Sequence, residues 1–180
     1  TNFIPPNLIW LYLRHNSIST DGCRELAKLL QGEDATLTQL HLQSNKIGDD
    51  GVEILVDVLQ NNKSLTTLSL LGNDGISDQG QIMLLKLVND VSSIKAALQS
   101  NHKLRCLDLD TLDADEEIQK HIDQALAINI MAEGNSGAAG RIKVIHTQLH
   151  SATRAAFARL QAVNHSLYNE INPLHLPEVL

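Results

Sequence analysis

A leucine frame that returns at nearly constant spacing constrains this chain more than any other feature. The frame reads L-x-x-L-x-L-x-x-N-x-I and begins at Leu8, Leu37 and Leu65, the third copy with one inserted residue near its end. A degraded fourth copy begins at Leu104 and has Leu112 where the asparagine would stand. Repeats of this period indicate a stack of similar units rather than one globular core.

Each frame predicts one short strand followed by one helix. Leu11 and Leu13 alternate with Tyr12, as a half-buried strand requires. The asparagine side chain can hydrogen-bond the backbone at the turn that follows. Short polar residues and a glycine come next, as at a helix start, and apolar residues then recur at helical spacing. We expect parallel strands to begin near Trp10, Gln39, Thr67 and Cys106.

Composition excludes several classes of function. The net charge of −7 argues against sequence-independent binding of nucleic acid, which needs a basic surface. No apolar run approaches the roughly 20 residues that span a bilayer. Two cysteines, Cys23 and Cys106, form no disulfide framework, which favours a reducing compartment. With no signal peptide before the repeats, we expect a cytoplasmic protein.

The frames, together with the segment from Ile47 to Gly51, resemble the leucine-rich repeat family. The resemblance covers roughly residues 8–130 and is strongest to the ribonuclease-inhibitor-like subclass, which has a full α-helix in each repeat. It implies an α/β fold, a curved right-handed solenoid with parallel strands on the concave face and helices on the convex face. It also implies protein–protein recognition, usually on the concave face.

The family includes cytosolic inhibitors, immune receptors, GTPase-activating proteins and effectors that intracellular bacteria inject into host cells. The favoured hypothesis is a non-enzymatic module that binds another protein and regulates or inhibits an enzyme by covering its active site. An effector or effector regulator in the host-cell cytosol fits this hypothesis. The alternative is a GTPase-activating regulator, which would present an arginine such as Arg14 to a nucleotide site.

The third repeat is about 10 residues too long, with the excess between Gly80 and Leu104. Its apolar spacing predicts one longer helix, or two helices broken near residues 89–90 or 92–93. Two interpretations stay open for this insertion. It is either a surface extension or a ridge that a partner recognises.

After a glycine-rich connection over residues 129–140, the repeat does not return. Residues 141–168 carry a near-heptad apolar stripe that predicts a long helix. This helix either caps the last repeat, docks on a partner as a coiled coil, or lies on a membrane surface. The predicted organisation is therefore repeats over 1–130, a linker over 131–140 and a C-terminal helical cap or extension over 141–180.

Catalytic and metal-binding sites are not favoured. His41 and Cys106 fall two strands apart, about 10 Å, whereas a base and a nucleophile need about 3 Å. The acidic run that starts at Asp108 lacks the glycine-turned calcium loop, so it is either an acidic helix start or a rim for a basic partner. His146 and His150 lack a third ligand and are interpreted as surface residues. We therefore expect no cofactor, no metal and no small-molecule substrate.

The frame identifies the side chains on the exposed face of the strands, because alternate strand residues point to opposite faces. Trp, Tyr and Arg, which are enriched at binding hot spots, gather on the first strand, and the far strand is acidic. The alternative is that the two aromatic residues pack under a further N-terminal repeat. The predicted partner-binding residues are Trp10, Tyr12, Arg14, His15, Gln39, His41, Gln43, Ser69, Leu71, Asp108 and Asp110.

Overall fold

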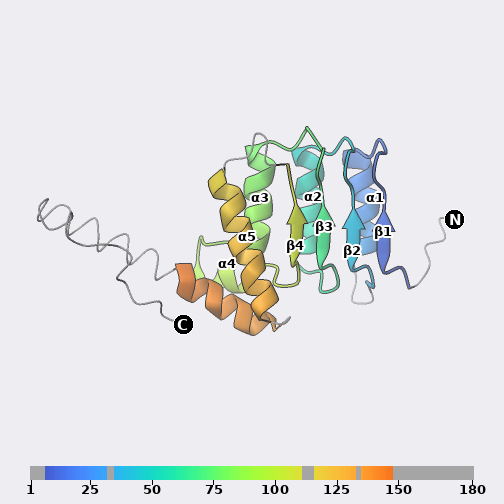
Figure 1. Cartoon of the computed structure of the whole chain (residues 1–180). Coiled ribbons are helices and arrows are strands. Elements are labelled where there is room, and N and C mark those ends of the chain that lie inside the picture. The colour runs from blue at the N-terminus through green and yellow to red at the C-terminus, as the bar shows by residue number, and fades with distance from the viewer. Residues whose placement is uncertain (1–6, 32–34, 111–115, 133–134, 148–180) are drawn as a thin grey trace, which may run out of the picture. The chain divides into compact units, whose positions relative to one another are not determined.

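The computed structural model describes residues 7–31, 35–110, 116–132 and 135–147 of the 180-residue chain (Figure 1). Its contacts divide the chain into two compact units, residues 1–144 and 145–180. In the second unit only residues 145–147 are described, and they are helical. The fold that follows is that of the first unit.

Four short strands form one parallel sheet. They are β1 (Trp10–Tyr12), β2 (Gln39–His41), β3 (Thr67–Ser69) and β4 (Cys106–Asp108), in the spatial order β1-β2-β3-β4. The central leucines of the four frames, Leu11, Leu40, Leu68 and Leu107, align across the sheet. The strands expected from the leucine frames are confirmed.

A helix follows each strand and runs antiparallel to it. These helices are α1 (Thr20–Leu30), α2 (Asp49–Leu59), α3 (Asp78–Val88) and α5 (Glu116–Met131). Each packs on the next, α1 on α2, α2 on α3 and α3 on α5, so the helices form a layer behind the sheet (Figure 1). The other face of the sheet carries no helix among the described residues, and we call it the open sheet face.

The frame leucines and the apolar helix residues meet between the two layers. Leu40, Leu42 and Ile47 of the second repeat are completely buried. Their counterparts Leu11 and Leu13 in the first repeat are only partly buried. The frame leucines of the first repeat, which has a described neighbour on one side only, are thus less buried than those of the second, as expected for a stack of units.

The frame asparagines join each repeat to the one before it. Asn73 donates from Nδ2 to the carbonyl oxygens of Leu42 and Leu70, at 3.0 and 2.7 Å, and its Oδ1 accepts the N–H of Ile47 at 3.1 Å. Asn45 makes the same set of bonds one repeat earlier, to the backbone of Leu13, Leu42 and Ile18. The predicted role of the asparagine at the turn is confirmed, and it extends across repeats.

The insertion in the third repeat forms a separate helix. α3 ends at Val88, and α4 (Ile94–Gln99) begins after a break over residues 89–93. Of the two forms expected from the spacing, the structure has two helices rather than one long helix. Gly140, on the helix over residues 136–147, lies against α4, where a Cβ would come within 3.0 Å of Leu98 Cδ2.

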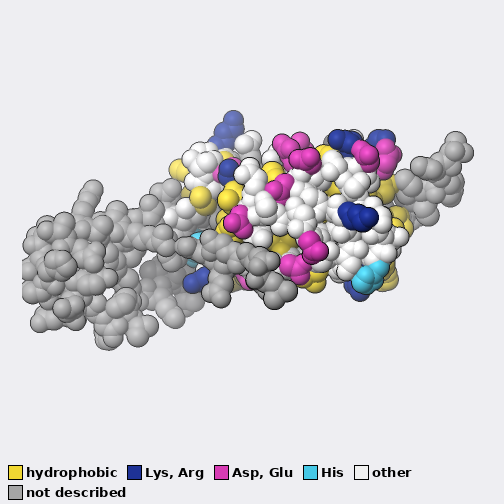
Figure 2. All heavy atoms as spheres, turned by 90° about the horizontal axis from the view of Figure 1, so that it is seen from above, with side chains coloured by type: hydrophobic (Ala, Val, Ile, Leu, Met, Phe, Trp, Pro, Cys, Tyr) yellow, Lys and Arg dark blue, Asp and Glu magenta, His cyan; other side chains and the backbone are white. Residues whose placement is uncertain are grey.

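Acidic residues occupy the starts of the helices. Asp21 lies in the first turn of α1, Asp49 and Asp50 in that of α2, and Asp78 in that of α3. Seen along the strands from their carboxyl ends, acidic side chains gather over this edge of the molecule (Figure 2). A carboxylate near a helix N-terminus is stabilised by the helix dipole, so these charges have a local structural reason.

Candidate functional site

The open sheet face brings the strand residues of the predicted site into register. Tyr12 lies opposite His41, His41 opposite Ser69, and Ser69 opposite Asp108. Trp10 and Gln39 are paired in the same way one row earlier. The alternation of the frame leucines therefore places these predicted residues in adjacent rows, as the sequence indicates.

Two aromatic side chains on β1 stand out from this face. Trp10 is 59% exposed and Tyr12 is 55% exposed, so no element among the described residues covers either ring. The Tyr12 ring stacks on the imidazole of His41, with ring centroids 4.5 Å apart and planes 10° from parallel. One face of Tyr12 is thus held by β2 while the residue remains largely accessible.

Arg14 completes a group of contacting side chains that we call the β1–β2 cluster, made up of Tyr12, Arg14, His41 and Gln43. The Arg14 guanidinium lies 5.7 Å from the centre of the Tyr12 ring, within cation–π range. Arg14 and Gln43 both hydrogen-bond Nδ1 of His41, through the Arg14 guanidinium nitrogen at 3.2 Å and the Gln43 Nε2 at 3.3 Å. The cluster links side chains from two adjacent repeats.

These bonds determine the protonation of His41. Arginine is only a donor, so Nδ1 must be the acceptor, and the neutral imidazole then carries its hydrogen on Nε2. Burial lowers the pKa of His41, and the positive charge of Arg14 lowers it further, whereas Asp108 acts in the opposite direction. His41 is therefore neutral at pH 7, which lets it accept from Arg14 without charge repulsion.

Buried polar atoms lie in the middle of the open sheet face. Ser69, which the sequence predicts to be an exposed residue of the binding face, is instead completely buried, and its Oγ has no hydrogen-bond partner among the described residues. The Nε2 of His41 and the Oε1 of Gln43 are also buried and unpartnered. A buried polar group without a hydrogen-bond partner is destabilising, so these three atoms do not contribute to the stability of the sheet.

The fourth strand carries Cys106 and Asp108. The Cys106 thiol donates to Oδ1 of Asp108, with the sulfur and oxygen 3.2 Å apart. Burial raises the pKa of Cys106 to about 11, and Asp108 contributes in the same direction. The thiol is protonated at neutral pH, whereas a nucleophilic cysteine needs a thiolate. Strand β3 lies between Cys106 and His41, as the leucine frame predicts.

The remaining predicted residues lie on the turns that follow the strands. The carboxylate of Asp110 accepts the backbone N–H of Gly72, so it ties the turn after β3 to the end of β4. Gly72 has a φ of 68°, and the equivalent residues His15 and Ser44 also have positive φ values. Leu71 is 38% exposed beside this turn. These residues follow the carboxyl ends of the strands and are not part of the β1–β2 cluster.

A second set of asparagines, which the sequence did not predict, also joins each repeat to the one before it. Asn62 donates to the carbonyl oxygen of Leu30 at the end of α1, and Asn101 donates to that of Leu59 at the end of α2. Both asparagines also accept the N–H three residues later, from Leu65 and Leu104. The signal was present as N-x-x-L directly before two of the frames.

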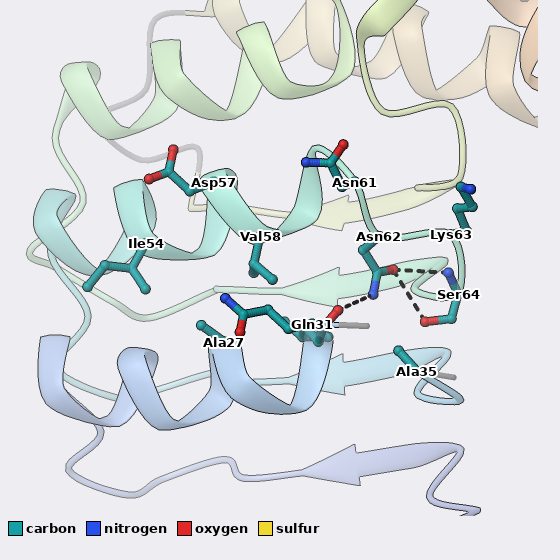
Figure 3. A pocket seen from close by; sticks show the side chains of 11 residues that line it. Ala27, Gln31, Ala35, Ile54, Asp57, Val58, Asn61, Asn62, Lys63 and Ser64 are labelled. Atoms are coloured by element: carbon teal, nitrogen blue, oxygen red, sulfur yellow. Dashed lines mark hydrogen bonds between the residues drawn. The ribbon is translucent and has the colours of Figure 1, made fainter. Parts of the chain in front are cut away.

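The helix layer contains a pocket that the sequence did not predict. It has a volume of about 900 Å³ and lies between α1, α2 and the loop after α2. Apolar side chains such as Ala27, Ile54 and Val58 line one part, and Asn62 lies on the polar part with its bonds to Ser64 (Figure 3). Its lining residues come from separate segments, so no single stretch of sequence carries a pattern for it.

The described part of the chain has neither a metal-binding cluster nor a membrane-spanning helix. Within it, no three histidine, cysteine or acidic side chains lie close enough together to hold a metal ion. No described helix combines the length and apolar character that a membrane crossing needs. The predicted residue His150 and the acidic residues at 111–115 lie outside the described ranges.

Comparison with known proteins supports the repeat interpretation. A family model described as "Leucine Rich repeat" matches residues 33–56 and 61–85, which contain the second and third frames. None of the curated proteins compared with the chain matches it. The chain thus contains two recognised leucine-rich repeats, which support its relation to the leucine-rich repeat family.

Proposed function

We propose that this chain is a non-enzymatic module that binds a partner protein through its open sheet face. Leucine-rich repeats generally mediate protein–protein interaction, and two are recognised here. We propose this face because Trp10 and Tyr12 are both accessible on it, and Tyr12 lies beside Arg14. Aromatic and arginine side chains dominate the energetic centres of protein interfaces.

Rigidity of the β1–β2 cluster also supports this function. The strands hold the backbone, and stacking and hydrogen bonds hold the Tyr12 and Arg14 side chains. Little side-chain entropy is then lost on binding, which leaves more of the contact energy for affinity. The full α-helix in each repeat supports a ribonuclease-inhibitor-like subclass, with the open sheet face as the concave side of a curved solenoid.

Regulation of an enzyme by steric cover is the form of binding that we favour, as an inhibitor, effector or effector regulator. We also propose a cytoplasmic location, in host cytosol if the protein is an injected effector. The unpaired Cys23 and Cys106 support a reducing compartment. Fractionation of cells that express the tagged chain tests this location.

Differential capture tests the proposed binding face. The full chain and the double variant Trp10→Ala, Tyr12→Ala are used as baits side by side, with the helix-face variant Glu53→Ala as control. We expect at least one protein to be retained by the wild type and the control but not by the double variant. Calorimetry on that protein should show a loss of at least about 2 kcal/mol for the double variant. Equal retention by all three baits contradicts the proposal.

A further inference from the structure

Arg14 is an exposed cation with no acidic partner among the described residues. The ion pairs in that part of the chain join Arg24 to Asp21 and Lys28 to Glu25, both on α1. Arg14 instead contacts a neutral imidazole and an aromatic ring. Its guanidinium has five N–H donors in a fixed fork, and the bond to His41 uses only one nitrogen. The remaining donors are available to a ligand.

His41 positions this guanidinium. Its Nδ1 holds one nitrogen of Arg14 at 3.2 Å, while its ring is fixed against Tyr12. A carboxylate in place of His41 would neutralise Arg14, and a charged imidazole would repel it. A neutral acceptor orients the cation and leaves its charge uncompensated, which is the arrangement needed to bind an anion.

Asp108 provides an opposite charge on the far strand. One of its oxygens accepts from the Cys106 thiol, a weak donor, and its side chain is partly accessible. No lysine, arginine or histidine forms an ion pair with it among the described residues. The Arg14 guanidinium reaches His41 on β2, which is two strand spacings, about 10 Å across the sheet, from the strand that carries Asp108.

We infer that the open sheet face recognises a protein segment with two opposite charges, an acidic side chain that pairs with Arg14 and a basic side chain that pairs with Asp108. This inference rests on the proposed function, because it describes the partner of the same face. We identify the ligand by charge complementarity. The bound segment would cross the strands with its acidic residue over the β1–β2 cluster and its basic residue over Asp108. A polyphosphate or nucleic acid would be repelled by Asp108 and by the chain's net charge of −7, so we do not favour it as the ligand. The experiment includes a measurement that would detect its binding.

Selection from a random 12-residue peptide library, displayed through the peptide C-termini, tests the inference. Display in this form leaves no free C-terminal carboxylate, so the acidic groups selected are Asp or Glu side chains. Selections are run on the full chain, on Arg14→Glu and on Asp108→Lys. The control is Arg24→Glu, which makes the same charge change on α1, away from the sheet.

Wild type and the Arg24→Glu control should select peptides that carry both an acidic and a basic residue. Arg14→Glu should replace the acidic preference with a basic one, and Asp108→Lys should replace the basic preference with an acidic one. His41→Phe keeps a ring beside Tyr12 but removes the acceptor, so the best wild-type peptide should bind it at least about fivefold more weakly, or about 1 kcal/mol. The His41→Gln variant keeps an acceptor, so it should lose less affinity for the same peptide than His41→Phe does.

Two different failures can be distinguished. If the selected peptides depend on Trp10 and Tyr12 but their charges do not change with Arg14→Glu, this inference is wrong and the binding face stands. If they bind the Trp10→Ala, Tyr12→Ala variant as well as the wild type, the proposed face itself is wrong. Binding of a fluorescent single-stranded oligonucleotide that is lost with Arg14→Glu would overturn the choice of a protein segment.

Discussion

The ammonium nitrogen of Lys143 lies 2.5 Å from the carbonyl oxygen of Val88, the last residue of α3, which precedes it by 55 residues. Lys143 is 1% exposed, and its nitrogen also lies 3.3 Å from Nδ1 of His102. The helical segment over residues 136–144 is therefore attached to the third repeat by a buried amine. Burial lowers the pKa of Lys143 to about 7.

This buried amine predicts a pH dependence of stability. The pKa of Lys143 is about 7 in the folded state, against about 10.5 for an ordinary lysine, so between these values the unfolded chain binds the extra proton. Stability should therefore increase as the pH rises from about 7 to 10.5, by at most about 1.4 kcal/mol per pH unit from this group. Below pH 7 both states are protonated and the penalty is constant.

Urea unfolding of the wild type and of Lys143→Met across this range measures the effect. The difference in free energy of unfolding between the two proteins isolates Lys143 from the cysteines, which titrate in the same range. The exposed Lys46→Met variant serves as control and should track the wild type. A difference between wild type and Lys143→Met that does not change with pH contradicts the assignment.

Asn73→Ala should be strongly destabilising. The substitution removes hydrogen bonds to three backbone groups in the buried turn and leaves the N–H of Ile47 without an acceptor. A cost of at least about 3 kcal/mol is expected from chemical denaturation, because each orphaned buried group costs about 1–3 kcal/mol. Asn16→Ala is the matched control. Asn16 is exposed and donates only to Leu13 and Arg14 of its own repeat among the described residues, so a loss of about 1 kcal/mol is expected.

Gly51→Ala should destabilise the protein although alanine favours helices. A Cβ at this position would lie 2.9 Å from Cγ2 of Ile47 and 3.1 Å from Sγ of Cys23, both completely buried. The crowding costs about 1–3 kcal/mol, and the helix propensity of alanine offsets about 1 kcal/mol. Gly137→Ala, whose nearest atoms lie at 3.5 Å, is the control and should be neutral or stabilising in the same thermal unfolding assay.

Asp108→Ala and Asp110→Ala should behave differently. Asp110 accepts the backbone N–H of Gly72, so its removal should cost about 1 kcal/mol of stability. Among the described residues the Asp108 side chain accepts only from a thiol, so its removal should change stability by less than about 0.5 kcal/mol while weakening binding. Equal losses of stability in the two variants would show that the two carboxylates do not have these separate roles.

The sequence alone determined the repeat and its faces. Leu40, Leu68 and Leu107 alternate with polar neighbours, and a period of two residues specifies which side chains enter the core. The same period places Tyr12, His41 and Asp108 on the opposite face. These features depend on local pattern and on stacking of similar units, both of which are visible along the chain.

Tertiary structure decided the contacts between side chains that are distant in sequence. The bond from Arg14 to His41, the tie from Asp110 to Gly72 and the burial of Lys143 against Val88 join residues 27, 38 and 55 positions apart. The period of the frame assigns a side chain to a face but not to a rotamer or a partner. Those depend on the packing of neighbouring repeats, and this packing makes His41 a neutral acceptor and Lys143 a buried amine.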